Sequence, residues 1–93
     1  MIKRIVKMTF APERVADFQA IFNASSPLIR AFPGCRHLEL WQSLPPNDNV
    51  LFTFSHWDSE EALNHYRQSE LFISTWARTK VLFAGKAEAW TVV

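Results

Sequence analysis

Three side chains of this sequence are candidates for chemistry: His56, Tyr66 and Arg4. His56 alternates with Phe52 and Phe54 along a strand-like segment. It is the candidate base, because imidazole is the side chain that exchanges protons near neutral pH. Tyr66 could donate a hydrogen bond to a substrate oxygen, and the guanidinium of Arg4 could balance an anion. A base, a donor and a cation could together ionise a small molecule and hold the resulting ion.

The side chains expected to surround such a molecule are mostly apolar and come from several predicted elements. Besides Arg4, the expected substrate-binding residues are Val6, Phe22, Phe52, Phe54 and Trp76. A cavity lined by them, between a sheet and its helices, would be dry, and removing water strengthens the polar interactions inside.

Each candidate also has a structural interpretation, which the sequence leaves open. His56 could hydrogen-bond the start of the next helix, and Tyr66 could be a core residue with a satisfied hydroxyl. Arg4 could pair with an acidic residue on a neighbouring strand. Aromatic alternation is what any half-buried strand shows. Ordinary core positions are therefore the alternative for Phe52, Phe54 and Trp76.

The first half of the chain predicts a strand followed by a long helix. Residues 2–10 are rich in β-branched and apolar types, and Ile2, Val6, Met8 and Phe10 share one face. A helix follows, because Pro12 suits a first turn and an apolar stripe runs down to the Pro33-Gly34 break: Val15, Phe18, Ile21, Phe22, Leu28, Ile29 and Phe32. Pro27 removes one backbone hydrogen bond, so a kink or a tighter turn is expected near Ser25 and Ser26.

Two strands joined by a turn come next. Residues 36–44 alternate, with Leu38 and Leu40 on the face opposite His37 and Trp41. The turn formers at 45–49 reverse the chain, so residues 50–57 pair antiparallel to the preceding strand. This third strand is expected to turn Phe52, Phe54 and His56 toward the helices, and Leu51, Thr53, Ser55 and Trp57 to the other side.

The remaining sequence predicts two short helices and a last strand. Asp58 or Ser59 could cap a helix, with Glu61 at capping-box spacing from Asp58. Leu63 and Tyr66 would face inward in it, whereas Glu60, Asn64 and Arg67 would face water. Ser69 could cap a second segment carrying Phe72, Ile73, Trp76, Lys80 and Phe83 on one side, and residues 86–92 alternate as a strand.

This order of elements predicts one α+β domain over residues 1–93. It is the ferredoxin-like βαββααβ arrangement, with a four-stranded antiparallel sheet and helices on one face. The other face is expected to carry Ile5, Trp41, Leu51, Trp57 and Trp90, and so many large apolar side chains are costly in water. A second copy of the chain should cover them, giving a homodimer through the sheet face and a dimeric α/β barrel.

Charge and composition narrow the functional classes. The formal charge is +1, with 10 basic and 9 acidic residues interleaved along the chain, which argues against nucleic acid or a membrane surface as partner. Residues 49–57 lack the Gly and the basic residue of an RNA-binding strand. The three His residues lack zinc-site spacing, so no metal is expected. No signal peptide or apolar membrane span is recognisable, and the protein is expected to be soluble and cytoplasmic.

Several segments together resemble the antibiotic biosynthesis monooxygenase family of dimeric α/β barrels. They are the Pro33-Gly34-Cys35 turn, the strand end Phe54-Ser55-His56-Trp57, the helix start Ser59-Glu60-Glu61-Ala62-Leu63, and Ser69 followed by Phe72. The resemblance spans nearly the whole chain. It implies the barrel fold, and the family's activities range from cofactor-independent oxygenation of aromatic polyketides and quinols to haem degradation.

The chain departs from the family at positions that matter for chemistry. Many members carry a His three residues before the motif Ser and another just before the Phe, and these positions are Tyr66 and Leu71 here. No His follows His65, so the axial ligand of the haem-degrading members has no counterpart. No cofactor is therefore expected.

The resemblance and the apolar pocket together imply a cofactor-independent monooxygenase with a small aromatic, quinol or enolisable substrate. Such a reaction needs a substrate that can give an electron to O2, and a protein that takes a proton and steadies an oxyanion in a dry site. The alternative is a non-catalytic dimeric ligand-binding or stress-response barrel of the same fold.

Overall fold

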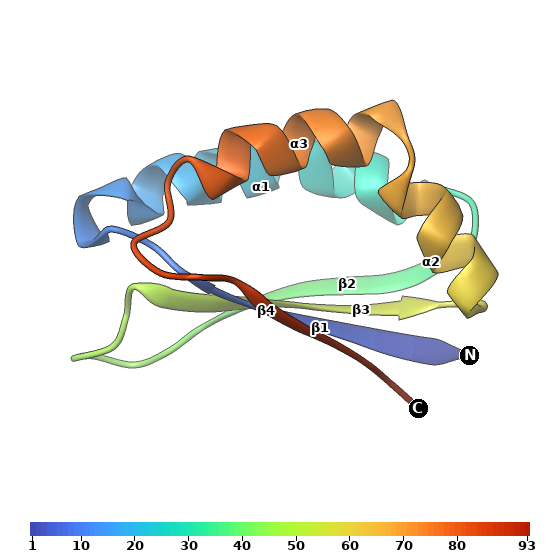
Figure 1. Cartoon of the computed structure of the whole chain (residues 1–93), viewed down its shortest axis with the longest axis horizontal. Coiled ribbons are helices and arrows are strands. Elements are labelled where there is room, and N and C mark those ends of the chain that lie inside the picture. Colours follow the sequence, from blue (N-terminus) through green and yellow to red (C-terminus); the bar gives the residue numbers. More distant parts are fainter.

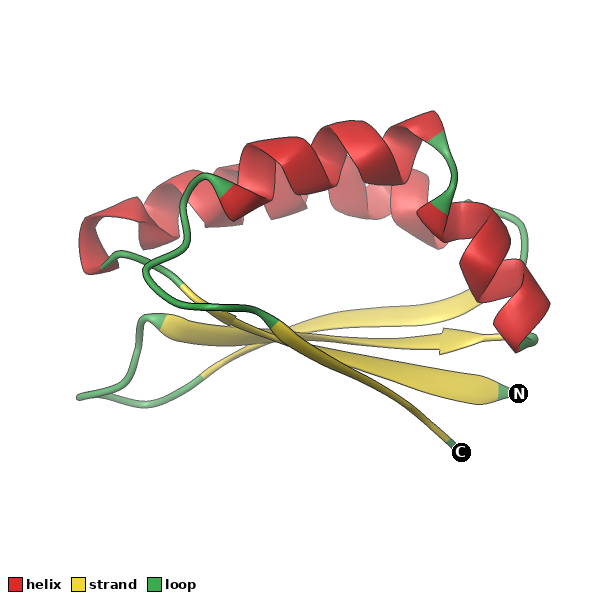
Figure 2. Ribbon diagram, in the orientation of Figure 1, coloured by secondary structure: helices red, strands yellow, loops and turns green.

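A four-stranded antiparallel sheet covered on one face by helices makes up the computed structural model, which describes residues 1–93 (Figures 1 and 2). The strand order is β2-β3-β1-β4. The elements are β1 (Ile2–Thr9), a 3-10 turn (Pro12–Arg14), α1 (Val15–Arg30), β2 (Cys35–Gln42), β3 (Val50–Trp57), α2 (Glu60–Arg67), α3 (Glu70–Lys80) and β4 (Glu88–Val92). The predicted ferredoxin-like α+β fold is confirmed.

Side-chain caps start both short helices. The Ala62 N–H donates to the Ser59 hydroxyl at 3.1 Å, and the Phe72 N–H donates to the Ser69 hydroxyl at 3.1 Å. Both satisfy a backbone donor that has no partner within its own helix. Of the two cap candidates at the start of α2, Ser59 is thus the one used. The Asp58 carboxylate instead accepts two hydrogen bonds from Arg36, at 2.6 and 2.9 Å.

The long helix α1 differs in two ways from its predicted form. It continues through Pro27 without a tighter turn, and the Ala31 N–H donates to the Pro27 carbonyl at 3.1 Å. Leu28 is 59% exposed, whereas Ser25 and Ser26 are buried. The Ser25 hydroxyl can be buried because it donates to the Ile21 carbonyl at 2.8 Å.

The faces of β3 are the reverse of those predicted. Val6 lies opposite Thr53, and Met8 lies opposite Leu51, in the β1–β3 ladder. Directly opposed residues share a face of the sheet, so Leu51 and Thr53 face the helices together with Val6 and Met8. Leu51 is fully buried, and Trp57, on the same face of β3, is 1% exposed. Both were expected on the open face, and this expectation is wrong.

The open face of the sheet consequently carries Phe52, Phe54 and His56, which were expected to face the helices. The reversal has a physical reason: alternation reveals two faces of a strand but not which one turns inward, and both faces of β3 bear large apolar groups. Through the ladders β3 shares this face with Lys3, Ile5, Lys7, His37, Glu39, Trp41, Glu88, Trp90 and Val92. The prediction of an apolar open face stands, although two of its expected members are replaced.

Candidate functional site

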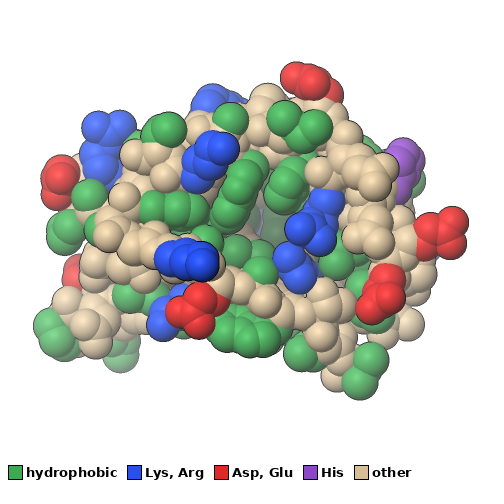
Figure 3. Space-filling model, viewed as in Figure 1, with side chains coloured by type: hydrophobic (Ala, Val, Ile, Leu, Met, Phe, Trp, Pro, Cys, Tyr) green, Lys and Arg blue, Asp and Glu red, His purple; other side chains and the backbone are tan.

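A cavity of about 360 Å³ lies between the sheet and its helices, and the space-filling view shows the hollow opening on one side of the molecule (Figure 3). Of the 22 residues that line it, 14 are hydrophobic. Binding sites for small molecules are concave and mostly apolar with a few polar groups, and this volume is at the small end of their range. The cavity suits a ligand of a few rings.

Stacked aromatic rings form one wall of the cavity. The ring of Tyr66 in α2 stacks on Trp57 of β3 with centroids 4.8 Å apart, and meets Phe72 of α3 edge-on at 5.3 Å. Phe72 in turn lies parallel to Trp76 at 6.0 Å. Capping by Ser69 fixes where α3 begins and therefore where these two rings lie. The wall presents flat apolar surfaces to a ligand.

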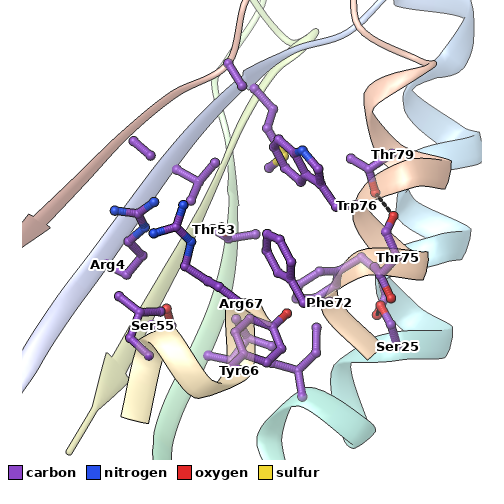
Figure 4. Close-up of a pocket in the computed structure, with 18 of the residues that line it drawn as sticks. Arg4, Ser25, Thr53, Ser55, Tyr66, Arg67, Phe72, Thr75, Trp76 and Thr79 are labelled. Carbon is purple, nitrogen blue, oxygen red and sulfur yellow. Dashed lines mark hydrogen bonds between the residues drawn. The ribbon is translucent and has the colours of Figure 1, made fainter. Parts of the chain in front are cut away.

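Tyr66 is the hydrogen-bond donor of this wall. No hydrogen bond within the chain engages its hydroxyl, which points into the cavity among the labelled side chains of Figure 4. Burial, with a smaller contribution from Cys35, raises the pKa of Tyr66 from 10.0 to about 12. At neutral pH the phenol therefore keeps its proton, and it can donate a hydrogen bond but not act as a base.

Two guanidinium groups lie at one end of the cavity, Arg4 from β1 and Arg67 from the last turn of α2 (Figure 4). Arg4 donates to the Thr91 hydroxyl on β4 at 2.9 Å. Its pKa is lowered, first by burial and then by the positive charge of Arg67. Neither arginine has an ion pair. The alternative in which Arg4 pairs with an acidic residue is therefore wrong.

The cavity has few other polar groups. Glu88 is the only acidic residue among its lining, but its side chain lies on the open face of the sheet, where the carboxylate pairs with Lys7 at 3.8 Å. The Ser55 hydroxyl accepts a hydrogen bond from the Trp57 indole at 3.0 Å. The Thr75 hydroxyl is buried and has no partner. No imidazole lines the cavity, so its walls contain two cations and hydroxyl groups but no free base.

Five of the predicted site residues line the cavity: Arg4, Val6, Phe22, Tyr66 and Trp76. The other three, Phe52, Phe54 and His56, lie across the sheet. There the His56 ring lies 5.2 Å from the ring of His37 and 5.0 Å from that of Phe54, and its Nε2 is buried without a partner. The sheet thus separates the predicted base from the cavity.

Sequence reasoning missed Arg67, Trp57, Phe72 and Thr75 as cavity residues. Helical spacing predicted that Arg67 faces solvent, and Arg67 is indeed an exposed residue. A long arginine side chain can nonetheless reach along a helix end and place its charge elsewhere. Its position next to Tyr66 at the end of a short helix was the only signal available.

Two further findings concern metals and membranes. No group of three or more His, Cys, Asp or Glu side chains is placed to hold a metal ion. None of the helices has both the length and the apolar character needed to cross a bilayer.

Comparison with solved structures finds the same fold in several proteins. Rv0793 from Mycobacterium tuberculosis has a TM-score of 0.88 at 22% identity, over 99% of this chain and 92% of that one. A conserved protein from Methanosarcina mazei Go1 has a TM-score of 0.89 at 19% identity, over 97% and 88%. An antibiotic biosynthesis monooxygenase has a TM-score of 0.90 at 15% identity, over 100% and 97%. A search of curated proteins gives no match.

The fold and the cavity define the class as ferredoxin-like α+β proteins with a pocket between the sheet and the helices. The sequence of residues 1–77 matches the family described as Antibiotic biosynthesis monooxygenase. The chain belongs to this family, as its sequence resemblance predicted.

Proposed function

We propose that this protein is a cofactor-independent monooxygenase that acts on a small aromatic quinol or enolisable substrate in the cavity. One observation carries the proposal: the protonated phenol of Tyr66 and two guanidinium groups without ion pairs line the same, mostly apolar cavity. Donors and cations fixed in a dry site stabilise an oxyanion far more than water does.

The reaction can be written for a substrate with a methylene group conjugated to an enolisable ketone through aromatic rings, such as an anthrone. Its enolate gives one electron to O2, and the resulting substrate radical and superoxide combine into a peroxide with a new C–O bond. Uptake of a proton and loss of water leave a carbonyl, so that CH2 and O2 become C=O and H2O. The carbon loses the four electrons that O2 gains, and no external reductant is required.

Different residues of the cavity would favour ionisation of the substrate and bind it. Because no free base lines the cavity, the substrate has to ionise to solvent as it enters, and the charges of Arg4 and Arg67 favour its anion. Tyr66 would donate to the substrate oxygen, and the rings of Trp57 and Trp76 would exclude water. A catalytic role for His56 has no geometric support, since its side chain lies on the opposite face of the sheet.

Oxygen uptake by the pure protein tests this function. With a panel of anthrones and naphthoquinols, we expect consumption of O2 above the rate of the uncatalysed reaction. Tyr66→Phe should lower kcat/KM by roughly 100-fold, the usual cost of losing one oxyanion donor. His56→Ala should leave it within about twofold. Uptake equal to the uncatalysed rate across the panel would reject the proposal.

The absence of a free base in the cavity also favours a second candidate function, a non-catalytic ligand-binding or stress-response barrel. A bound ligand stabilises the folded state by mass action, whether or not it reacts. Ligands that raise the melting temperature without O2 uptake would favour this second function.

The same proposal includes a homodimer formed through the open sheet face. Trp41 and Trp90 on that face are 41% and 46% exposed, and Trp41 stacks on Phe54 with centroids 4.8 Å apart. An apolar patch of this kind usually marks an interface. A second sheet packed against the first would bury it, and the two sheets would then form a barrel.

A further inference from the structure

We propose that Arg4 and Arg67 form a carboxylate-binding subsite, and that the ligand of the cavity is a planar ring system carrying a carboxylate at one end. This inference rests on the proposed function for one point only, the identity of the ring system as a quinol or enol. It adds an ionised group that the oxygenation itself does not require, and it assigns the hydrogen bonds of the two arginines to that group, while Tyr66 remains the donor to the reacting oxygen.

The two guanidinium groups form a cation pair that nothing in the chain neutralises. Figure 4 shows them beside each other at one end of the cavity, one on β1 and one at the end of α2. Like charges at close range repel each other, and the lowered pKa of Arg4 reflects both its burial and the charge of Arg67. An anion placed between them would turn this repulsion into two attractions.

No acidic side chain of the chain forms an ion pair with either arginine. Glu88, the only acidic residue among the cavity lining, turns its carboxylate to the open face of the sheet, where it pairs with Lys7 at 3.8 Å. The Thr91 hydroxyl, which accepts from Arg4 at 2.9 Å, is neutral and uses one of the five N–H donors of that guanidinium. This contact holds the group in place and leaves the other donors free for a ligand.

A carboxylate fits the pair of arginines. The planar fork of a guanidinium matches a carboxylate with two parallel hydrogen bonds, and such charge-assisted bonds are the strong ones. The rest of the cavity is mostly hydrophobic, so it suits a single compact anion on an apolar body. A phosphate group also matches a guanidinium fork, and the comparison with a phosphate ester in the test below separates the two anions.

The far side of the cavity defines the other end of the ligand. The Thr75 hydroxyl is buried without a partner, and the Tyr66 hydroxyl is free. In Figure 4 the rings of Tyr66 and Phe72 lie between the arginines and Thr75. A buried polar group without a hydrogen bond is costly, so a ligand hydroxyl or carbonyl at this side would be stabilising. The ligand thus has an anion at one end, aromatic rings in the middle and an oxygen at the other end.

Calorimetric titration with 6-hydroxy-2-naphthoate and with its methyl ester tests the subsite. The probe has two polar ends and a bicyclic body, and its methyl ester removes the charge and adds one methyl group. We expect the acid to bind about tenfold more tightly than the ester, as for a charge-assisted pair of hydrogen bonds. Arg67→Gln, and separately Arg4→Gln, should remove this preference and leave the affinity for the ester within about twofold.

The matched control is Arg78→Gln on α3, because Arg78 is exposed and lies outside the cavity. This control should bind both probes as the unaltered chain does, and circular dichroism should show the same fold for all variants. Equal affinity for acid and ester, no binding of either, or an unchanged preference in Arg67→Gln would overturn the proposal. Tighter binding of 2-naphthyl phosphate than of the acid would also overturn it, in favour of a phosphate ester.

Because binding is measured without O2 consumption, the two proposals can fail separately. A preference for the acid with no uptake of O2 on any quinol would reject the monooxygenase and keep the subsite. Turnover of a neutral anthrone with no preference for the acid would reject the subsite alone.

Discussion

Tyr66 is the only tyrosine of the chain, so the ionisation of its phenol can be followed without interference from another. Burial raises its pKa to about 12, and we expect the tyrosinate absorbance of the folded protein to stay absent at pH 10 and to appear only near the higher value. In urea the same band should appear near pH 10. Ionisation near pH 10 while circular dichroism still shows the native fold would contradict the buried position of this hydroxyl.

The same shift links Tyr66 to alkaline stability. The folded state keeps the phenolic proton in a range where the unfolded chain has lost it, because its pKa is raised from 10.0 to about 12. This contribution to stability is present below pH 10 and is lost as the pH rises toward 12. The free energy of unfolding of Tyr66→Phe should therefore fall less steeply with pH, between pH 10 and 12, than that of the unaltered chain. Urea titrations at successive pH values measure both. An equal fall of the unfolding free energy with pH in the two proteins would contradict a contribution from the Tyr66 proton.

Side chains of the site were predictable where helical spacing or strand alternation fixed their direction. Tyr66 and Trp76 follow from helical spacing, and Arg4 follows from its alternation with Val6. His56 was misplaced because the open face of β3 is as apolar as the buried one, so the sequence pattern of that strand does not say which face is inside. Arg67 was missed because spacing describes where a Cβ points and not where a long side chain ends.

At the scale of elements, the turn at Gly34 determines where α2 lies. Gly34 has φ of +89°, and its carbonyl accepts the Asp58 N–H at 2.9 Å. A Cβ at Gly34 would lie 2.6 Å from the Cβ of Ala62 in α2. Helix α2 therefore packs directly on this turn, and the turn sets the height at which Tyr66 and Arg67 enter the cavity.

Replacement of Gly34 by alanine should destabilise the protein by about 1–3 kcal/mol, because it combines a strained φ with a clash against the Ala62 side chain. The matched control is Gly85→Ala, whose Cβ would be 3.6 Å from the Cβ of Thr9, an ordinary contact. That variant should be neutral or up to about 1 kcal/mol more stable, since alanine restricts the unfolded chain. Urea unfolding followed by tryptophan fluorescence at one protein concentration measures both. Equal stabilities of the two variants would count against the close packing of α2 on Gly34.

Local signals predicted the elements well for an identifiable reason. Ser59 and Ser69 cap helices because serine satisfies an unpaired N–H wherever a helix begins, and Pro33-Gly34 ends one because no helix continues through it. Pro27 was expected to kink the helix or tighten its turn, and the α-helix runs through it without a tighter turn, because one missing hydrogen bond is a small loss in a helix packed along its length. Tertiary packing, which a local pattern does not contain, decided that case.

At the scale of the whole molecule, the open sheet face predicts the state of association. The chain of 10.8 kDa exposes Trp41, which stacks on Phe54, and Trp90 on the same face of the sheet. It should therefore sediment as a species of twice that mass at micromolar concentration. Phe54→Arg should shift the equilibrium toward monomer, because it places a charge at the centre of the apolar face without touching the buried core. Trp90→Lys provides an independent variant on the outer strand β4.

The control for the dimer interface is Leu28→Arg, which adds the same charge to another exposed apolar residue. Leu28 is 59% exposed on α1, on the helical side of the molecule. If the sheets pack face to face, this variant stays dimeric while the two sheet variants dissociate. Dissociation by Leu28→Arg alone would place the interface on the helices instead. A stable monomer of the unaltered chain at micromolar concentration would contradict the proposed homodimer.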